Sequence, residues 1–213
     1  MTKTILFDLD GTLTDSGEGI INCASLALER LGLPVPDRNT LRVFVGPPLD
    51  KTFREFGVPE ELVEEAIRIY RSRYIPIGKY ENYPYPGIRE MLERLKQEGH
   101  RLYIATSKPE AMSVEILEHF GFAQYFDGIC GATLDTSRST KEDVIAYLLG
   151  KHRTDGPMLM VGDTVYDVIG AKIHGIRAVG VDWGYGETQD MITAGAAAIA
   201  YDPQQLLQIL LTI

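Results

Sequence analysis

Two acidic residues follow a short apolar run near the N-terminus. Asp8 and Asp10 come directly after residues 4–7, and Gly11 allows the chain to turn. Side chains two positions apart on a strand point to the same side, so the two carboxylates are expected to lie close together. Such a pair is costly unless a cation lies between the groups or one of them holds a proton. The segment therefore favours a ligand site over an ordinary acidic turn.

Three further segments carry groups that suit phosphate or a metal ion. Thr106 and Ser107 end a predicted strand just before a helix, where hydroxyls and free N–H groups can bind a phosphoryl oxygen. Asp163 follows another predicted strand, and Asp167 lies one helical turn later on the same side. Lys141 lies near a predicted helix start. Taken alone, each segment is explained by helix capping or by a solvated charge, but their combination indicates a site.

Short β-rich runs alternate with helical stretches from about residue 80 onward. This alternation implies βαβ units and a mostly parallel sheet, an α/β fold with a Rossmann-like three-layer core. The carboxyl ends of such strands are where ligands bind. The strand at residues 4–7 should be central because it is apolar throughout. Further strands are predicted at 101–105, 157–161, 178–181 and 197–200, and helices at 109–120 and 165–174.

Residues 16–83 break this rhythm. Apolar residues recur there at helical spacing, and no convincing strand separates them. The simplest interpretation is a helical cap inserted after the first strand, with a Pro/Gly-rich hinge at residues 84–87. We therefore expect a core formed by residues 1–15 and 84–213. The apolar positions are Ile20, Ile21, Ala24, Leu28 and Leu31, then Leu62, Val63, Ala66, Ile67 and Tyr70.

Composition narrows the class of protein. The 213 residues are 45% hydrophobic, which allows a sizeable core, and the net charge of −9 argues against nucleic acid as a partner. No apolar run reaches membrane-spanning length, and Asp8 interrupts any signal-like start. Cys23 and Cys130 lie far apart in apolar surroundings, as expected of buried thiols in a reducing cytoplasm. The sequence carries no signal of oligomeric state.

In their order and spacing, the four segments resemble the motifs of the haloacid-dehalogenase superfamily of phosphohydrolases over nearly the whole chain. Residues 8–12 resemble its nucleophile motif and residues 162–167 its metal-binding motif, while the insertion is similar to its mobile cap. Three further stretches, Val-Gly-Pro-Pro-Leu at 45–49, Thr-Ser-Lys-Pro at 106–109 and Val-Asp-Trp-Gly-Tyr-Gly at 181–186, resemble the phosphoglycolate-phosphatase-like branch.

The resemblance implies a phosphatase with a covalent aspartyl-phosphate intermediate. Asp8 would attack phosphorus. Asp10 would serve as acid and base, and would be protonated when substrate binds because of the charges of Asp8 and Asp163. The cofactor would be Mg²⁺, held by hard oxygen ligands: the Asp8 and Asp163 carboxylates and the Asp10 backbone carbonyl. Asp167 would orient either Lys141 or a water molecule that is bound to the metal.

The remaining residues would bind the substrate. Either Thr106 or Ser107 would donate to a phosphoryl oxygen, and Lys141 would balance its charge. The small cap predicts small phosphorylated metabolites: phosphoglycolate-like acids, nucleoside monophosphates, as in a 5'-nucleotidase, or sugar phosphates. Arg42 and Lys51, with Arg54, flank residues 46–48 and are candidates for a second anionic group, although each also fits a solvated helix charge. Arg42 is the first candidate for a carboxylate.

Several other functions share parts of this pattern. A phosphomutase similar to β-phosphoglucomutase would share every core motif and differ in its cap. A phosphonoacetaldehyde hydrolase needs a cap lysine, for which Lys51 is available. A dehalogenase is disfavoured because it has no use for Asp10. A non-catalytic phosphate-binding module is of another class, and the intact Asp8 and Asp10 pair argues against it.

Overall fold

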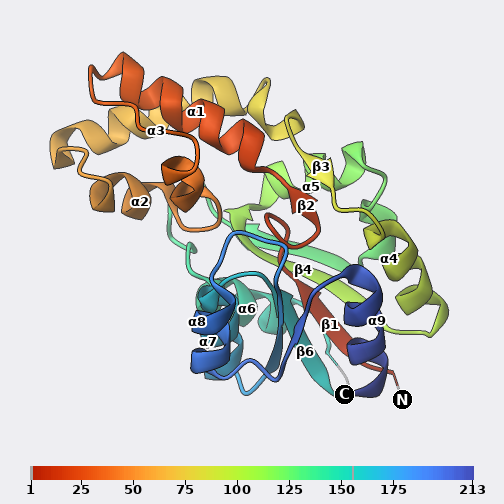
Figure 1. The fold of residues 1–213 in the computed structure, drawn as a ribbon. Helices are drawn as coiled ribbons and strands as arrows, with labels where there is room; N and C mark the ends of the chain where they lie inside the picture. The colour runs from red at the N-terminus through yellow and green to blue at the C-terminus, as the bar shows by residue number, and fades with distance from the viewer. Residues whose placement is uncertain (1, 155) are drawn as a thin grey trace.

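A six-stranded parallel sheet forms the centre of the protein (Figure 1). The computed structural model describes residues 2–154 and 156–213. The strand order is β5-β4-β1-β6-β7-β8, so β1 has neighbours on both sides, and its apolar residues Ile5 to Phe7 are fully buried, as predicted. The strands are β1 (Thr4–Phe7), β4 (Arg101–Pro109), β5 (Gly128–Ala132), β6 (Met158–Gly162), β7 (Arg177–Val181) and β8 (Ala198–Ala200).

Helices cover both faces of this sheet and complete the three predicted layers. Ile5 and Phe7 face one side, where α4 (Ile88–Gln97), α5 (Glu110–His119) and α9 (Pro203–Thr212) pack against them. Leu6 points to the other side, because successive strand residues alternate between faces. That side is covered by α6 (Lys141–Lys151), α7 (Val165–Ile173) and α8 (Thr188–Ala194).

Two strands depart from the sequence expectation. β5 was not predicted, because its two glycines, Gly128 and Gly131, leave too short an apolar pattern. β4 runs beyond the predicted end at residue 105 and reaches Pro109, with a register irregularity against β5 between Thr106 and Pro109. The irregular stretch, residues 106–109, lies beyond the end of the pairing between β4 and β1, at the edge of the sheet where Asp8 follows β1.

The helical segment, residues 16–83, has its own apolar core. Figure 1 shows it in red to yellow, beside the sheet. Apolar residues at the predicted helical spacing, such as Ala24, Leu28 and Ala66, are buried in it together with Phe44 and Phe53. Its elements are α1 (Gly17–Arg30), η1 (Thr40–Phe44), α2 (Leu49–Glu55), α3 (Glu60–Tyr74) and η2 (Gly78–Tyr80). Among the described residues, no helix has the length and apolar character needed to span a membrane.

A short antiparallel ladder joins the two connections between the helical segment and the sheet. β2 (Thr14–Asp15) pairs with β3 (Tyr83–Pro84), so the chain leaves and re-enters the core side by side. The amide of Tyr85 also donates to the carbonyl of Leu13, at 3.1 Å. The ladder overlaps the Pro/Gly-rich hinge predicted at residues 84–87 at Pro84, and the exact domain boundaries stay a prediction.

Replacement of Gly19 by alanine should destabilise the helical segment. An added Cβ would lie 1.9 Å from the carbonyl oxygen of Gly78, a backbone atom that cannot give way cheaply. We expect Gly19→Ala to lower the free energy of unfolding by about 1–3 kcal/mol. Gly150→Ala is the matched control: it lies in α6 with nothing within 4 Å of the added carbon, and should raise stability by about 0.5–1 kcal/mol. Urea denaturation measures both, and an unchanged Gly19→Ala would contradict the close packing.

Candidate active site

The carboxyl end of β1 carries Asp8 and Asp10 into the interior. The amide of Asp8 donates to the carbonyl of Val161 at 2.9 Å and so continues the pairing with β6. Both side chains are buried, at 5% and 7% exposure. Gly11 then turns the chain with φ +80°, and a Cβ there would lie 2.1 Å from Oδ2 of Asp163. Only glycine therefore lets the first acidic segment approach Asp163 so closely.

Lys141 joins the first strand to α7 through its ammonium group. Nζ lies 2.8 Å from Oδ1 of Asp8 and 2.7 Å from Oδ1 of Asp167, and it donates to the carbonyl of Ala105 at 2.9 Å. The capping box of Thr140 and Asp143 starts α6 at this lysine and so fixes its position. Lys141 is only 4% exposed. It is a buried partner of two carboxylates and not a solvated surface charge.

Asp163 and Asp167 are held by the loop and the first turn that follow β6. Oδ2 of Asp163 accepts from the amide of Tyr185 at 2.8 Å, and Oδ1 accepts from the Thr12 hydroxyl at 3.2 Å. Oδ2 of Asp167 accepts from the amide and the hydroxyl of Thr164, at 3.0 and 2.8 Å. The other oxygen of Asp167 is therefore free to pair with Lys141.

Three buried carboxylates converge here and form a possible metal site. Oxygens of Asp8, Asp163 and Asp167 lie within 4.8 Å of one another, yet among the residues that the structure describes only one ammonium, that of Lys141, pairs with the group. Burial raises the pKa of Asp8 to about 6, against the opposing effect of Lys141. Burial, together with repulsion from Asp167 and Asp8, raises the pKa of Asp163 well above its usual value. Excess negative charge and hard oxygen donors suit a divalent cation.

The side chain of Asp10 lies apart from this cluster and pairs with Lys108. Nζ of Lys108 is 2.9 and 2.7 Å from the two carboxylate oxygens, and it lies 5.0 Å from the centre of the Tyr74 ring. The sequence predicted a protonated Asp10 because of the charges of Asp8 and Asp163. In the structure, both carboxylate oxygens of Asp10 accept from this ammonium. Protonation of Asp10 during a reaction stays a prediction, and Lys108 would first have to release the oxygen that takes the proton.

Thr106 and Ser107, which the sequence left as alternatives, have different surroundings. The Thr106 hydroxyl lies beside Asp8 and acts to lower the pKa of that carboxyl, accepts from the amide of Lys108 at 3.3 Å, and is buried. Ser107 is half-buried and lines a cavity. Thr106 is therefore the hydroxyl beside the predicted nucleophile.

A cavity of about 760 Å³, counting its open mouth, lies between the sheet edge and the helical segment. Asp10 and Lys108 form part of its wall, whereas Asp8 does not. The two acids thus have separate surroundings: Asp8 belongs to the carboxylate cluster and Asp10 to the cavity. The helical segment contributes a mostly apolar lining that includes Phe44, Pro47, Pro48, Ile67, Tyr70 and Tyr74.

The predicted cap residues Arg42 and Lys51 do not line this cavity. The guanidinium of Arg42 lies 4.6 Å from the centre of the Tyr185 ring and donates to the carbonyl of Gly184 at 3.3 Å. Nζ of Lys51 lies 3.3 Å from the Tyr166 hydroxyl. Both residues bridge the helical segment and the core. Arg54, the third candidate, pairs with Asp50 and Glu60 at the surface.

Sequence reasoning missed roles for two residues, Lys108 and Tyr185. The direction of Lys108 depends on the irregular end of β4, which periodicity does not reveal. Tyr185 binds Asp163 through its amide, and its hydroxyl contacts Asp15 and accepts from the amide of Gly17. It thereby connects the carboxylate cluster to the β2–β3 ladder. The available signal was its place in the Trp-Gly-Tyr-Gly stretch after β7.

Comparison with known proteins identifies the family. Residues 5–181 match the family described as haloacid dehalogenase-like hydrolase. This match spans more than half of the chain, which therefore belongs to that family, and the resemblance inferred from the motifs is confirmed.

Its relatives identify the kind of hydrolase. A 5'-nucleotidase of Pseudomonas aeruginosa is 43% identical over 88% of this chain and 86% of its own. The tyrosine-protein kinase PtkA of Mycobacterium tuberculosis is 45% identical over 86% of this chain but only 63% of its own. A predicted phosphatase from Clostridium acetobutylicum has a matching structure, with TM-score 0.96, 41% identity and full coverage of both chains. A phosphoglycolate phosphatase of Vibrio parahaemolyticus is 29% identical over 97% of this chain and 95% of its own. The protein is accordingly a phosphoric monoester hydrolase.

The stability of the metal-free protein should depend on pH through Asp8. Its pKa is raised from 3.8 to about 6, so its contribution to stability is present below pH 4 and is lost as the pH rises through 6. Asp8→Asn removes this charge. We expect the advantage of the variant over the wild type to grow between pH 4 and pH 7, by about 3 kcal/mol at most. Urea denaturation in chelator measures it, and a difference that does not change with pH would contradict the buried-charge argument.

Proposed function

We propose that this protein is a Mg²⁺-dependent phosphatase that hydrolyses small phosphate monoesters through an aspartyl-phosphate on Asp8. The observation that carries the proposal is the separation of the two acids. Asp8 lies beside Lys141 and Thr106, while Asp10 lines the cavity. A phosphoryl group at Asp8 would then direct its leaving group into the cavity, past Asp10. The names of the relatives, 5'-nucleotidase and phosphoglycolate phosphatase, support small phosphorylated metabolites as the substrate class.

Asp8 is the nucleophile in the first step. One of its carboxylate oxygens forms a bond to phosphorus as the bond between phosphorus and the leaving oxygen breaks. Lys141 and the Thr106 hydroxyl already lie at Asp8, so both are in position to neutralise and orient the transferred phosphoryl oxygens. Such positioning and charge neutralisation supply most of the rate acceleration in phosphoryl transfer.

Asp10 moves the proton in both steps. It donates a proton to the leaving oxygen in the first step. In the second step it takes one from the water that attacks phosphorus and releases phosphate from Asp8. Because Lys108 occupies both carboxylate oxygens of Asp10, the lysine has to move away before either oxygen can exchange a proton with the leaving group or with water. We infer that the incoming phosphate dianion attracts Lys108 and frees Asp10.

Asp8 and Asp163 would hold the metal ion, with the carbonyl of Asp10, and Asp167 would orient Lys141 beside it. When bound, Mg²⁺ supplies positive charge that offsets the buried carboxylates and the substrate phosphate. The residues fit this role because the cluster contains more carboxylates than ammonium groups.

The helical segment would act as a mobile cap about the β2–β3 ladder. In the structure it contacts the core through Arg42 on Tyr185 and Lys51 on Tyr166. These contacts suit a closed arrangement, which would exclude bulk water from the site.

Removal of the metal should abolish activity, and the metal should also stabilise the protein. We expect EDTA to eliminate phosphate release and Mg²⁺ to restore it. Mg²⁺ should raise the melting temperature of the wild type, because a ligand that binds only the folded state stabilises it. Asp163→Asn should raise the melting temperature in chelator, by removing a buried charge, and should abolish the further rise with Mg²⁺. Full activity in chelator would refute the metal assignment.

The two acids should fail in different ways. Asp8→Asn should form no phosphoenzyme and show no turnover. Asp10→Asn should still bind substrate, with kcat reduced by about 10²–10⁴-fold on phenyl phosphate and by less on para-nitrophenyl phosphate, whose leaving group needs less protonation. Steady-state phosphate release and intact-protein mass measure these effects. Turnover by Asp8→Asn would disprove the covalent step, and a burst of phosphoenzyme without steady release would indicate transfer to another acceptor.

A further inference from the structure

Arg71 is a cation of the cavity wall to which neither the motifs nor the proposed chemistry assigns a role. It lies on α3, one helical turn before Tyr74, whose ring contacts Lys108. Arg71 and Lys108 are the cations that line the cavity. Lys108 pairs with Asp10, whereas no carboxylate among the described residues pairs with Arg71. Asp50 lines the same cavity, but its partner is Arg54, at 2.6 Å.

The donors of Arg71 are largely unused. A guanidinium group carries five N–H donors in a planar fork. The structure gives Arg71 a single long hydrogen bond, 3.4 Å, to the carbonyl of Leu134 in the core. The other arginines of α3 are engaged: Arg68 binds Glu65, and Arg73 binds Glu81 through two hydrogen bonds. Arg71 is half-buried at the cavity and has donors available for a ligand.

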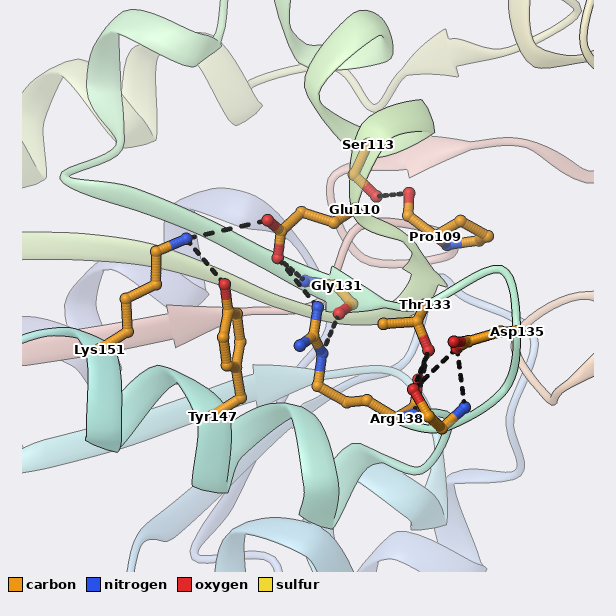
Figure 2. Close-up of polar contacts among 10 residues, drawn as sticks. Pro109, Glu110, Ser113, Gly131, Thr133, Asp135, Arg138, Tyr147 and Lys151 are labelled. Carbon is orange, nitrogen blue, oxygen red and sulfur yellow. Dashed lines mark hydrogen bonds and ion pairs between the residues drawn. The ribbon is translucent and has the colours of Figure 1, made fainter.

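The core loop formed by residues 133–139, whose Leu134 carbonyl accepts from Arg71, is anchored by the contacts of Arg138 that Figure 2 shows. Nε of Arg138 donates to the carbonyl of Gly131 at 2.7 Å, and Nη2 lies 3.4 Å from Oε2 of Glu110. The same Glu110 oxygen accepts from the amide of Gly131, at 3.2 Å. The guanidinium of Arg138 also lies 3.7 Å from the centre of the Tyr147 ring. These contacts tie the loop to β5, α5 and α6.

Contacts within the loop fix its shape as well. Oδ1 of Asp135 accepts from the amide and the hydroxyl of Ser137, at 3.1 and 2.7 Å, and the amide of Thr133 donates to the carbonyl of Arg138 at 2.8 Å. Thr136 has φ 62°, a left-handed conformation that is unfavourable for a threonine and persists only where the surroundings impose it. Thr133, Thr136 and Ser139 line the cavity. This part of the wall is therefore preformed.

We infer that Arg71 determines specificity by binding an oxygen acceptor on the leaving group of the substrate. This inference rests on the proposed function. The apolar side chains of Phe44, Ile67 and Tyr70 suit a planar or apolar body of the leaving group, and the Arg71 guanidinium suits a polar end. The substrate class is a phosphate monoester whose leaving group ends in a carbonyl or carboxylate oxygen. A carboxylate and a neutral carbonyl offer the same acceptor chemistry, which the experiment below separates.

The sequence predicted Arg42 as the first candidate to bind a carboxylate of the substrate, and we assign this role to Arg71. Arg42 lies against Tyr185 and outside the cavity lining, so its guanidinium is already stacked on the core. Both arginines reach across from the helical segment, but only Arg71 does so at the cavity.

The test compares matched aryl phosphates. Phenyl phosphate lacks an acceptor, whereas its 3- and 4-carbamoyl derivatives carry a neutral one and its 3- and 4-carboxy derivatives a charged one. We expect Arg71→Met to lower kcat/KM for at least one acceptor-bearing isomer by about 10–100-fold more than for phenyl phosphate, mainly through KM. Arg71→Lys should recover part of this loss, because it keeps the charge without the planar fork. Arg68→Met, on the same helix but paired with Glu65 outside the cavity, should show no selective loss.

Binding measurements keep this inference separate from the proposed chemistry. The same five ligands are titrated calorimetrically into Asp8→Asn and into Asp8→Asn with Arg71→Met. If the wild type hydrolyses none of the esters, the proposed function fails, and a selective loss of affinity still supports Arg71. A loss confined to the carboxy derivatives assigns an anionic acceptor, and a loss on both kinds includes a neutral carbonyl. An equal loss on all ligands, or none, overturns the inference, since Arg71 would then act only through its contact with Leu134.

Discussion

The ammonium of Lys141 is the interaction that allows the site to exist in the protein interior. It binds Asp8 and Asp167 and also the carbonyl of Ala105, so one cation connects the end of β1, the first turn of α7 and the middle of β4. Without it, several carboxylates would be buried side by side with no compensating charge, an arrangement that costs several kcal/mol. Even with it, negative charge remains in excess. Lys141 thus offsets enough of the buried negative charge for the protein to fold, and the negative charge that remains suits a cation.

A second buried pair, Lys108 with Asp10, has a different character. Lys141 is held from several sides, whereas Lys108 contacts a carboxylate at the cavity wall and the face of Tyr74, a residue of the helical segment. The contacts of Lys141 lie within the core, whereas the pair of Lys108 and Asp10 lies at the cavity wall beside the helical segment. The ammonium beside Asp8 is therefore supplied by the core alone, while the surroundings of Asp10 include the helical segment.

The sequence predicted the core of the site better than its periphery. Strand-end acids are constrained by the sheet, so the spacing of Asp8 and Asp163 was enough to bring their strand ends together, and β1 has the predicted bounds. Lys108 could not be predicted because its direction follows from one irregular pairing between β4 and β5. Helical periodicity predicted α3, but it could not indicate which arginine of the helical segment lines the cavity. In the structure this residue is Arg71, whereas Arg42 lies outside the lining. That depends on how two independently packed cores meet.

The ladder of β2 and β3 has an evolutionary consequence. Because the two connections of the helical segment run side by side, its ends are adjacent where it joins the core. A segment with adjacent ends can be shortened, lengthened or exchanged without altering the order or register of the parallel strands. The Asp8 cluster would be inherited intact while the cavity lining is replaced. Such modularity lets one ancestral phosphoryl-transfer centre diversify into lineages with different substrates, through exchange of a single inserted unit.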